Sequence, residues 1–129
     1  MGRVRLVLYK ESDGSIPLLD WLHSLTNRDR KAVLKCRAKL VLLSEFGNLL
    51  RRPAADYLRD GIYELRFESG GVNYRVLYFF SSTASALVVS HGLSKEARVP
   101  DREINRALER RRAFESNPEE HTCNETQHN

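Results

Sequence analysis

The chain has 129 residues, enough for one compact domain and too few for two. Its composition, 41% hydrophobic and 29% charged, is that of a globular protein and excludes a disordered chain. The last fourteen residues hold three acids and no Lys or Arg, so the rest of the chain carries 21 basic and 14 acidic residues, a net charge of +7. Such an excess favours an acidic partner, of which nucleic acid is the commonest.

The cysteines and the hydrophobic runs favour a reducing cytoplasm. Only Cys36 and Cys123 are present, which implies no disulfide framework. No apolar run reaches the roughly 18 residues of a membrane span. His121, Cys123 and His128 lack the close spacing of zinc ligands, so we expect neither a metal nor a cofactor.

In the first half of the chain, the residue pattern predicts a strand followed by a helical hairpin. Residues 3–9 alternate and predict a half-buried strand. Pro17 suits the first turn of a helix, and Thr26 or Asn27 is expected to cap a second helix that ends at Gly47. That second helix has an apolar stripe and a separate basic stripe, formed by Val33, Cys36, Leu40, Leu43 and Phe46, and by Lys31, Lys35 and Lys39.

In the second half, three strands and a helix are expected. Alternating runs at 62–68, 72–80 and 86–90 are separated by short turns, which predicts an antiparallel meander. Pro100 opens a final helix, and after Phe114 we expect a polar, loosely ordered tail.

Together these elements predict an α+β fold of order β-α-α-β-β-β-α, in which helices pack against one face of a small, mainly antiparallel four-stranded sheet. Residues 1–115 form the domain and 116–129 the tail. Its core is expected to include Trp21, Leu22, Leu40, Leu43, Leu65, Phe67 and Val88.

Four segments of this chain resemble the RelE/ParE superfamily of toxins. They are residues 62–66 (IYELR), 73–78 (NYRVLY), 91–95 (HGLSK) and 100–104 (PDREI), and the resemblance extends from residue 3 to about 115. The most similar members form the HigB-like, phage-related branch of type II toxin–antitoxin systems. The resemblance implies a RelE-like fold and an endoribonuclease that cuts mRNA, usually in the decoding site of the ribosome.

Arg75 is the first candidate for catalysis. Cleavage of RNA by its own 2′-hydroxyl needs a base, an acid and cations for the extra phosphate charge, but no metal. Arg75 matches the arginine with which the family contacts the scissile phosphate, and its planar guanidinium suits that charge. The alternative is an ordinary ion pair with Glu64 or Glu68.

Three further residues have both a functional and an ordinary interpretation. Arg66 is placed to hold the RNA backbone on the open sheet face, or is a solvated polar residue. Lys95 follows the last strand, where the family has basic residues, and is otherwise a loop lysine. His91 suits acid–base catalysis near neutral pH, but a structural hydrogen-bonding role is favoured.

The expected RNA contacts come from aromatic and basic residues. Tyr74 and Tyr78 are candidates for base stacking, although core packing is favoured for at least one of them. Lys35, Lys39 and Arg98 are the remaining candidate RNA-binding residues.

The chain departs from the best-studied RelE branch, which has two lysines where Ile62 and Glu64 stand here. Either Glu64 serves as the base, or positioning and cations act alone. Arg98 is a candidate replacement for a second lysine, whose place Glu96 takes.

Three functions compete on the sequence alone. The first is an RNase toxin acting on mRNA and the ribosome, and the second is a ParE-like inhibitor of DNA gyrase without catalysis. The third is a plain RNA-binding module. Both toxin interpretations imply an antitoxin, an acidic or helix-turn-helix protein that covers the basic cleft or displaces the final helix.

Overall fold

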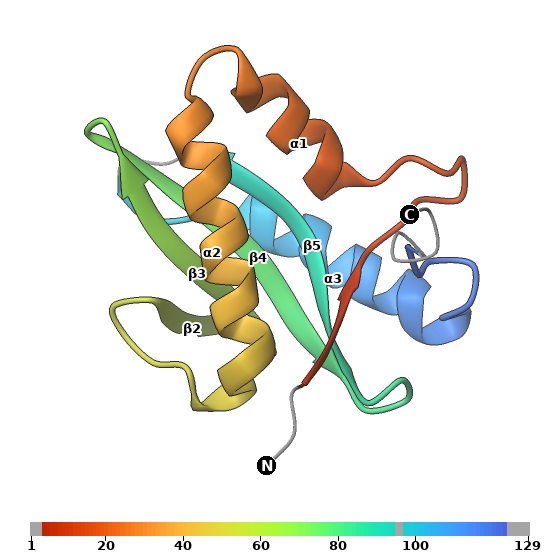
Figure 1. Cartoon of the computed structure of the whole chain (residues 1–129). Helices are drawn as coiled ribbons and strands as arrows, with labels where there is room; N and C mark the ends of the chain where they lie inside the picture. Colours follow the sequence, from red (N-terminus) through yellow and green to blue (C-terminus); the bar gives the residue numbers. More distant parts are fainter. Residues whose placement is uncertain (1–3, 95–96, 124–129) are drawn as a thin grey trace.

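The structure is a computed structural model that describes residues 4–94 and 97–123. Within these residues the chain forms five strands and three α-helices (Figure 1). The strands are β1 (Arg5–Leu8), β2 (Ala55–Arg59), β3 (Ile62–Ser69), β4 (Val72–Ser81) and β5 (Ala86–Ser94). The helices are α1 (Pro17–Thr26), α2 (Arg30–Phe46) and α3 (Asp101–Ser116), with a short 3₁₀ turn η1 (Gly47–Leu49) after α2. None of the described helices has the length and hydrophobicity needed to cross a membrane.

The strands form one sheet in the order β1-β5-β4-β3-β2. β1 is parallel to β5, and the other neighbours are antiparallel. The expected α+β class and the mainly antiparallel sheet are therefore confirmed, but the number of strands was wrong, because β2 was not predicted. Its sequence, ADYLR, is short and begins two residues after Pro53, so no apolar alternation marks it.

Helices cover both faces of the sheet, whereas the sequence predicted them on one face only. The α1–α2 hairpin packs on the face that carries Val76 and Tyr78, and α3 packs on the opposite face against Leu77 and Phe79 (Figure 1). The signal for this arrangement is the nearly continuous apolar run of β4, because a strand buried on both faces does not alternate.

The ends of the hairpin helices follow from local chemistry. Pro17 is the first residue of α1, and Gly47 ends α2 with a φ of 54°, as predicted. The cap of α2 is Asp29 rather than Thr26 or Asn27, and its carboxylate accepts a hydrogen bond of 3.0 Å from the backbone N–H of Ala32. This capping residue therefore fixes where the second helix begins.

Five of the seven residues predicted for the core are buried: Leu22, Leu43, Leu65, Phe67 and Val88. Trp21 and Leu40 are only partly buried at the edge of the hairpin layer.

Truncation of Leu43 is expected to cost more stability than truncation of Leu40, although both lie on α2. Leu43 has no exposed surface, so Leu43→Ala removes contacts on all sides and should lower the free energy of unfolding by about 2–5 kcal/mol. Urea unfolding of both variants measures the difference, and equal losses would contradict this account of the core.

The segment after α3 packs on β1, although a loose tail was expected there. The rings of His121 and Tyr9 stack with centroids 5.1 Å apart, and His121 Nδ1 lies 2.7 Å from the carbonyl oxygen of Lys10. The backbone N–H of Cys123 donates to the Leu8 carbonyl. Up to Cys123, the tail thus extends the edge of the sheet.

Candidate functional site

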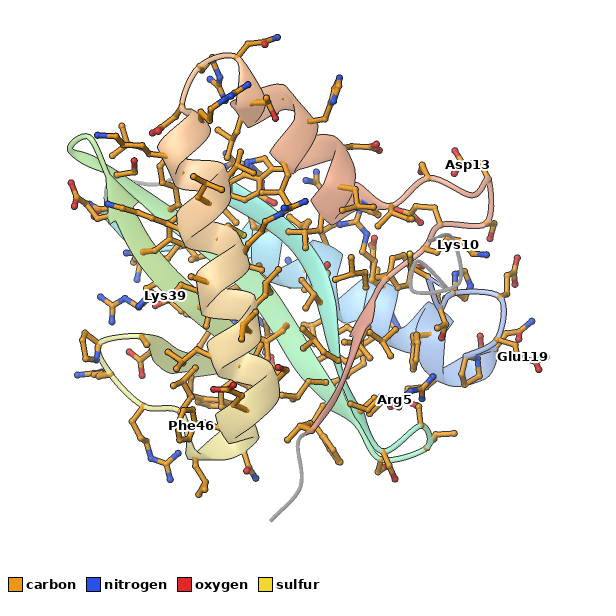
Figure 2. All side chains as sticks on the ribbon, in the orientation of Figure 1. Arg5, Lys10, Asp13, Lys39, Phe46 and Glu119 are labelled. Atoms are coloured by element: carbon orange, nitrogen blue, oxygen red, sulfur yellow. The ribbon has the colours of Figure 1, made fainter. Side chains whose placement is uncertain are left out.

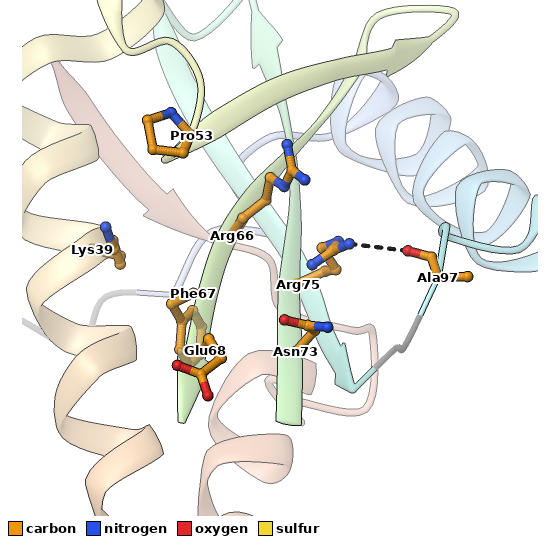
Figure 3. Close-up of a pocket in the computed structure, with 8 residues that line it drawn as sticks. All are labelled: Lys39, Pro53, Arg66, Phe67, Glu68, Asn73, Arg75 and Ala97. Carbon is orange, nitrogen blue, oxygen red and sulfur yellow. Dashed lines mark hydrogen bonds between the residues drawn. The ribbon is translucent and has the colours of Figure 1, made fainter. Parts of the chain in front are cut away.

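An open groove of about 500 Å³ lies where α3 leaves part of its sheet face uncovered (Figure 3). Arg66 on β3 and Arg75 on β4 stand opposite each other in the register, so both side chains lie on this face. Lys39 reaches the groove from α2, on the far side of β3 (Figures 2 and 3). The groove is lined by Lys39, Pro53, Arg66, Phe67, Glu68, Asn73, Arg75 and Ala97.

Arg75 is held in place from two sides. Its Nε atom lies 2.8 Å from Oε1 of Glu64, and its Nη2 donates a hydrogen bond of 3.0 Å to the Ala97 carbonyl. The contact with Glu64 is an ion pair rather than an aligned hydrogen bond, since neither of these two atoms has a hydrogen-bond partner among the described residues. Arg75 is only 7% exposed, so its guanidinium is fixed before any ligand arrives.

Glu64 lies between the two arginines of the groove and does not line the groove itself. Its second oxygen, Oε2, is 3.7 Å from Nε of Arg66. Burial raises the pKa of Glu64, against the lowering effect of Arg75 and Arg66. This position fits a residue that holds the arginines better than one that touches a ligand.

The ion pairs that join Arg75, Glu64 and Arg66 continue to residues on and before β2, a strand that sequence analysis missed. Oδ2 of Asp56 lies 3.8 Å from Nη1 of Arg66 and 2.9 Å from Nε of Arg52. Asp56 stands opposite Glu64 in the β2–β3 register, so it shares the groove face. No signal in the sequence marked Asp56 and Arg52, because their approach to Arg66 depends on a strand that was not predicted.

His91 lies under α3, outside the set of residues that line the groove. Its Nδ1 is 2.7 Å from Oγ of Ser90, and its Nε2 is 2.9 Å from Oε1 of Glu103 on α3. Burial lowers the pKa of His91 to about 4, even though the nearby Glu103 carboxylate raises it. A neutral ring that bonds to α3 supports the structural role over acid–base catalysis.

The low pKa of His91 predicts that stability falls in mild acid. Its folded-state pKa of about 4 lies below the ordinary value of 6.5, so the unfolded chain binds the proton first. The stabilisation is fully present above pH 6.5 and is lost as the pH falls toward 4, by at most about 1.4 kcal/mol per pH unit. Urea unfolding across this range measures the slope. His91→Gln should flatten it, and an unchanged slope in that variant would refute the assignment.

Tyr74 and Tyr78 lie on the opposite face of the sheet, in the core beneath the hairpin. The Tyr74 hydroxyl donates a hydrogen bond of 3.0 Å to the carboxylate of Asp29, and the Tyr78 ring stacks on Tyr63 with centroids 5.5 Å apart. Both are buried, so the structure brings neither to the groove.

The remaining candidates are cations around the groove. Nζ of Lys35 donates to the Glu68 carbonyl at 2.8 Å, beside the groove, whereas Arg98 is exposed in a neighbouring pocket on the α3 side. Lys95 lies outside the described residues. Among those residues, no group of three or more His, Cys, Asp or Glu side chains is arranged to hold a metal ion.

The groove is chemically suited to an anionic ligand. Arg66 and Lys39 present cations to the open space, and Arg75 adds a rigid guanidinium at its floor (Figure 3). Fixed donors of this kind stabilise negative charge on a phosphate more strongly than mobile surface cations.

A comparison with curated protein sequences found no match. A comparison with protein families matched residues 20–112 to the family described as phage-derived protein Gp49-like (DUF891), which is known as a RelE/ParE-like toxin family of toxin–antitoxin systems. The matched region runs from α1 into α3 and contains every residue that lines the groove. The chain therefore belongs to the phage-derived Gp49-like family of RelE/ParE-like toxins.

Proposed function

We propose that this toxin inhibits translation by cleaving mRNA at the ribosome, without a metal. The observation that carries the proposal is the pairing of Arg66 and Arg75 across β3 and β4 in an open groove. Two guanidiniums on neighbouring strands can grip one phosphate from two directions, which suits a transition state that gains negative charge.

In the proposed reaction, the 2′-oxygen of the RNA forms a bond to phosphorus and the bond to the 5′-oxygen breaks. A base takes the proton of the 2′-hydroxyl and an acid gives one to the leaving oxygen, so the products are a 2′,3′-cyclic phosphate and a 5′-hydroxyl. We assign the proton donor to Lys95. Because Glu64 is held between two arginines, we favour the alternative in which positioning and cations replace a protein base, and solvent water takes the proton of the 2′-hydroxyl.

Replacing Arg66 tests the groove with little risk to the fold, since its side chain is 34% exposed. Arg66→Ala should reduce mRNA cleavage about 10²-fold, because one fixed donor to the phosphate is lost. Arg102→Ala is the matched control, since Arg102 is an exposed arginine on α3 that does not line the groove. Mapping of mRNA 5′ ends after induction in cells measures both, and equal cleavage by the two variants would refute the proposal.

A further inference from the structure

The outer side of α2 carries an apolar stripe that the rest of the described chain leaves exposed. Leu34 is 61% and Val41 55% exposed, and the exposed Ala38 lies between them. Spacings of four and three residues place the three side chains on one side of the helix. Glu45, one turn beyond Val41, ends the stripe. In Figure 1, α2 lies across the sheet, so this side points away from it.

Cations flank the apolar stripe on both sides. At 3.6 residues per turn, Arg30 and Arg37 fall on one flank, and Lys31 and Lys35 fall on the other. All four are exposed. Within the described part of the chain, no carboxylate forms an ion pair with any of them, and Lys35 instead donates to a backbone carbonyl. The surface therefore has an apolar centre and two basic borders, with Asp29 near enough to interact with Lys35.

We infer that this stripe is the docking site for an acidic amphipathic helix of the antitoxin. Helices pair when apolar residues at this spacing meet, and glutamates or aspartates beside the apolar side chains of the partner would neutralise both basic borders. A second copy of this chain would bring the same cations together, which disfavours a symmetric dimer. RNA would gain nothing from Leu34 and Val41 at the centre. The inference rests on the toxin–antitoxin family but not on RNA cleavage.

The position of the stripe also explains how a docked helix would inhibit binding of RNA in the groove. Lys35, on one border, lies one helical turn from Lys39, which lines the groove. An acidic helix along this border places negative charge beside the groove, where it repels RNA phosphates.

The test measures binding of the full-length chain to the small protein encoded next to its gene, by calorimetry with purified proteins. Leu34→Glu and Val41→Glu should each weaken binding about 30-fold or more, because each places a carboxylate at the centre of an acidic interface. Phe80→Glu is the matched control, since Phe80 is 53% exposed and lies on β4 rather than on α2, and this variant should bind like the wild type. Arg37→Glu should also slow association and reduce its dependence on salt.

Absence of binding, or equal binding by all variants, would overturn the inference. So would a concentration-dependent dimer of the chain that Val41→Glu dissociates, or capture by phosphatidylglycerol vesicles that requires Leu34. Circular dichroism confirms that each variant is folded. RNA cleavage is measured without the partner protein. A failure of the docking inference therefore leaves the proposed cleavage reaction unaffected, and a failure to cleave RNA leaves the docking inference unaffected.

Discussion

Replacing Arg75 with lysine is expected to reduce mRNA cleavage about 10²–10³-fold while the protein stays folded. Lysine keeps the positive charge beside Glu64, so the buried carboxylate retains a cationic partner. It loses the planar pair of donors that a guanidinium offers to two oxygens of one phosphate. A rate of cleavage measured on purified protein therefore separates the geometry of Arg75 from its charge.

Arg75→Ala is a less direct test, because it leaves Glu64 buried and without its closest cation. Removing one partner of a buried ion pair costs about 3–5 kcal/mol, so loss of activity would be mixed with loss of folding. The double variant Arg75→Ala with Glu64→Gln removes both charges and serves as the control for stability. Wild-type cleavage by folded Arg75→Lys would show that Arg75 does not bind the phosphate.

Gly92→Ala is expected to destabilise this protein strongly. Gly92 lies on β5, and the six-membered ring of Trp21 from α1 covers it so closely that an added Cβ would overlap the ring carbons. The indole ring is rigid, and it also contacts Tyr74 edge to face, with centroids 6.0 Å apart. Overpacking costs about 1–3 kcal/mol in general, and we expect the upper end of this range here.

The partner of Gly92 provides the control. In the double variant Gly92→Ala with Trp21→Leu, the smaller leucine side chain leaves room for the methyl group. Gly92→Ala should therefore cost less stability in the Trp21→Leu background than in the wild type. Urea unfolding followed by circular dichroism measures all four proteins. Tryptophan fluorescence reports Trp21, the one tryptophan of the chain, in the two proteins that retain it. Full stability of Gly92→Ala would mean that α1 does not press against β5.

The elements with strong local signals were predicted well. Pro17 and Gly47 set the outer ends of the hairpin, and the alternation at 62–68 matches β3. The missed features depend on distant residues. Asp29 caps α2, and its carboxylate also accepts hydrogen bonds from Ser69 and Tyr74, which lie about forty residues later in the chain.

The candidate site was also predicted only in part, because some of its contacts join elements that are distant in the sequence. Arg66 and Arg75 were each proposed separately from the sequence, and the register of β3 and β4 places them opposite each other. The second partner of Arg66, Asp56, lies on β2, and the partner of His91, Glu103, lies on α3. Neither contact can be read from local patterns, since each depends on which face of the sheet a later element covers.

Cleavage of a defined mRNA by the purified protein, with and without ribosomes, tests the central claim most directly. The account predicts cleavage within the mRNA that leaves 5′-hydroxyl ends, is blocked by a 2′-deoxy substitution at the cut site, and is about 10²–10³-fold slower in Arg75→Lys. Intact mRNA under both conditions, together with inhibition of DNA gyrase by the same preparation, would contradict it.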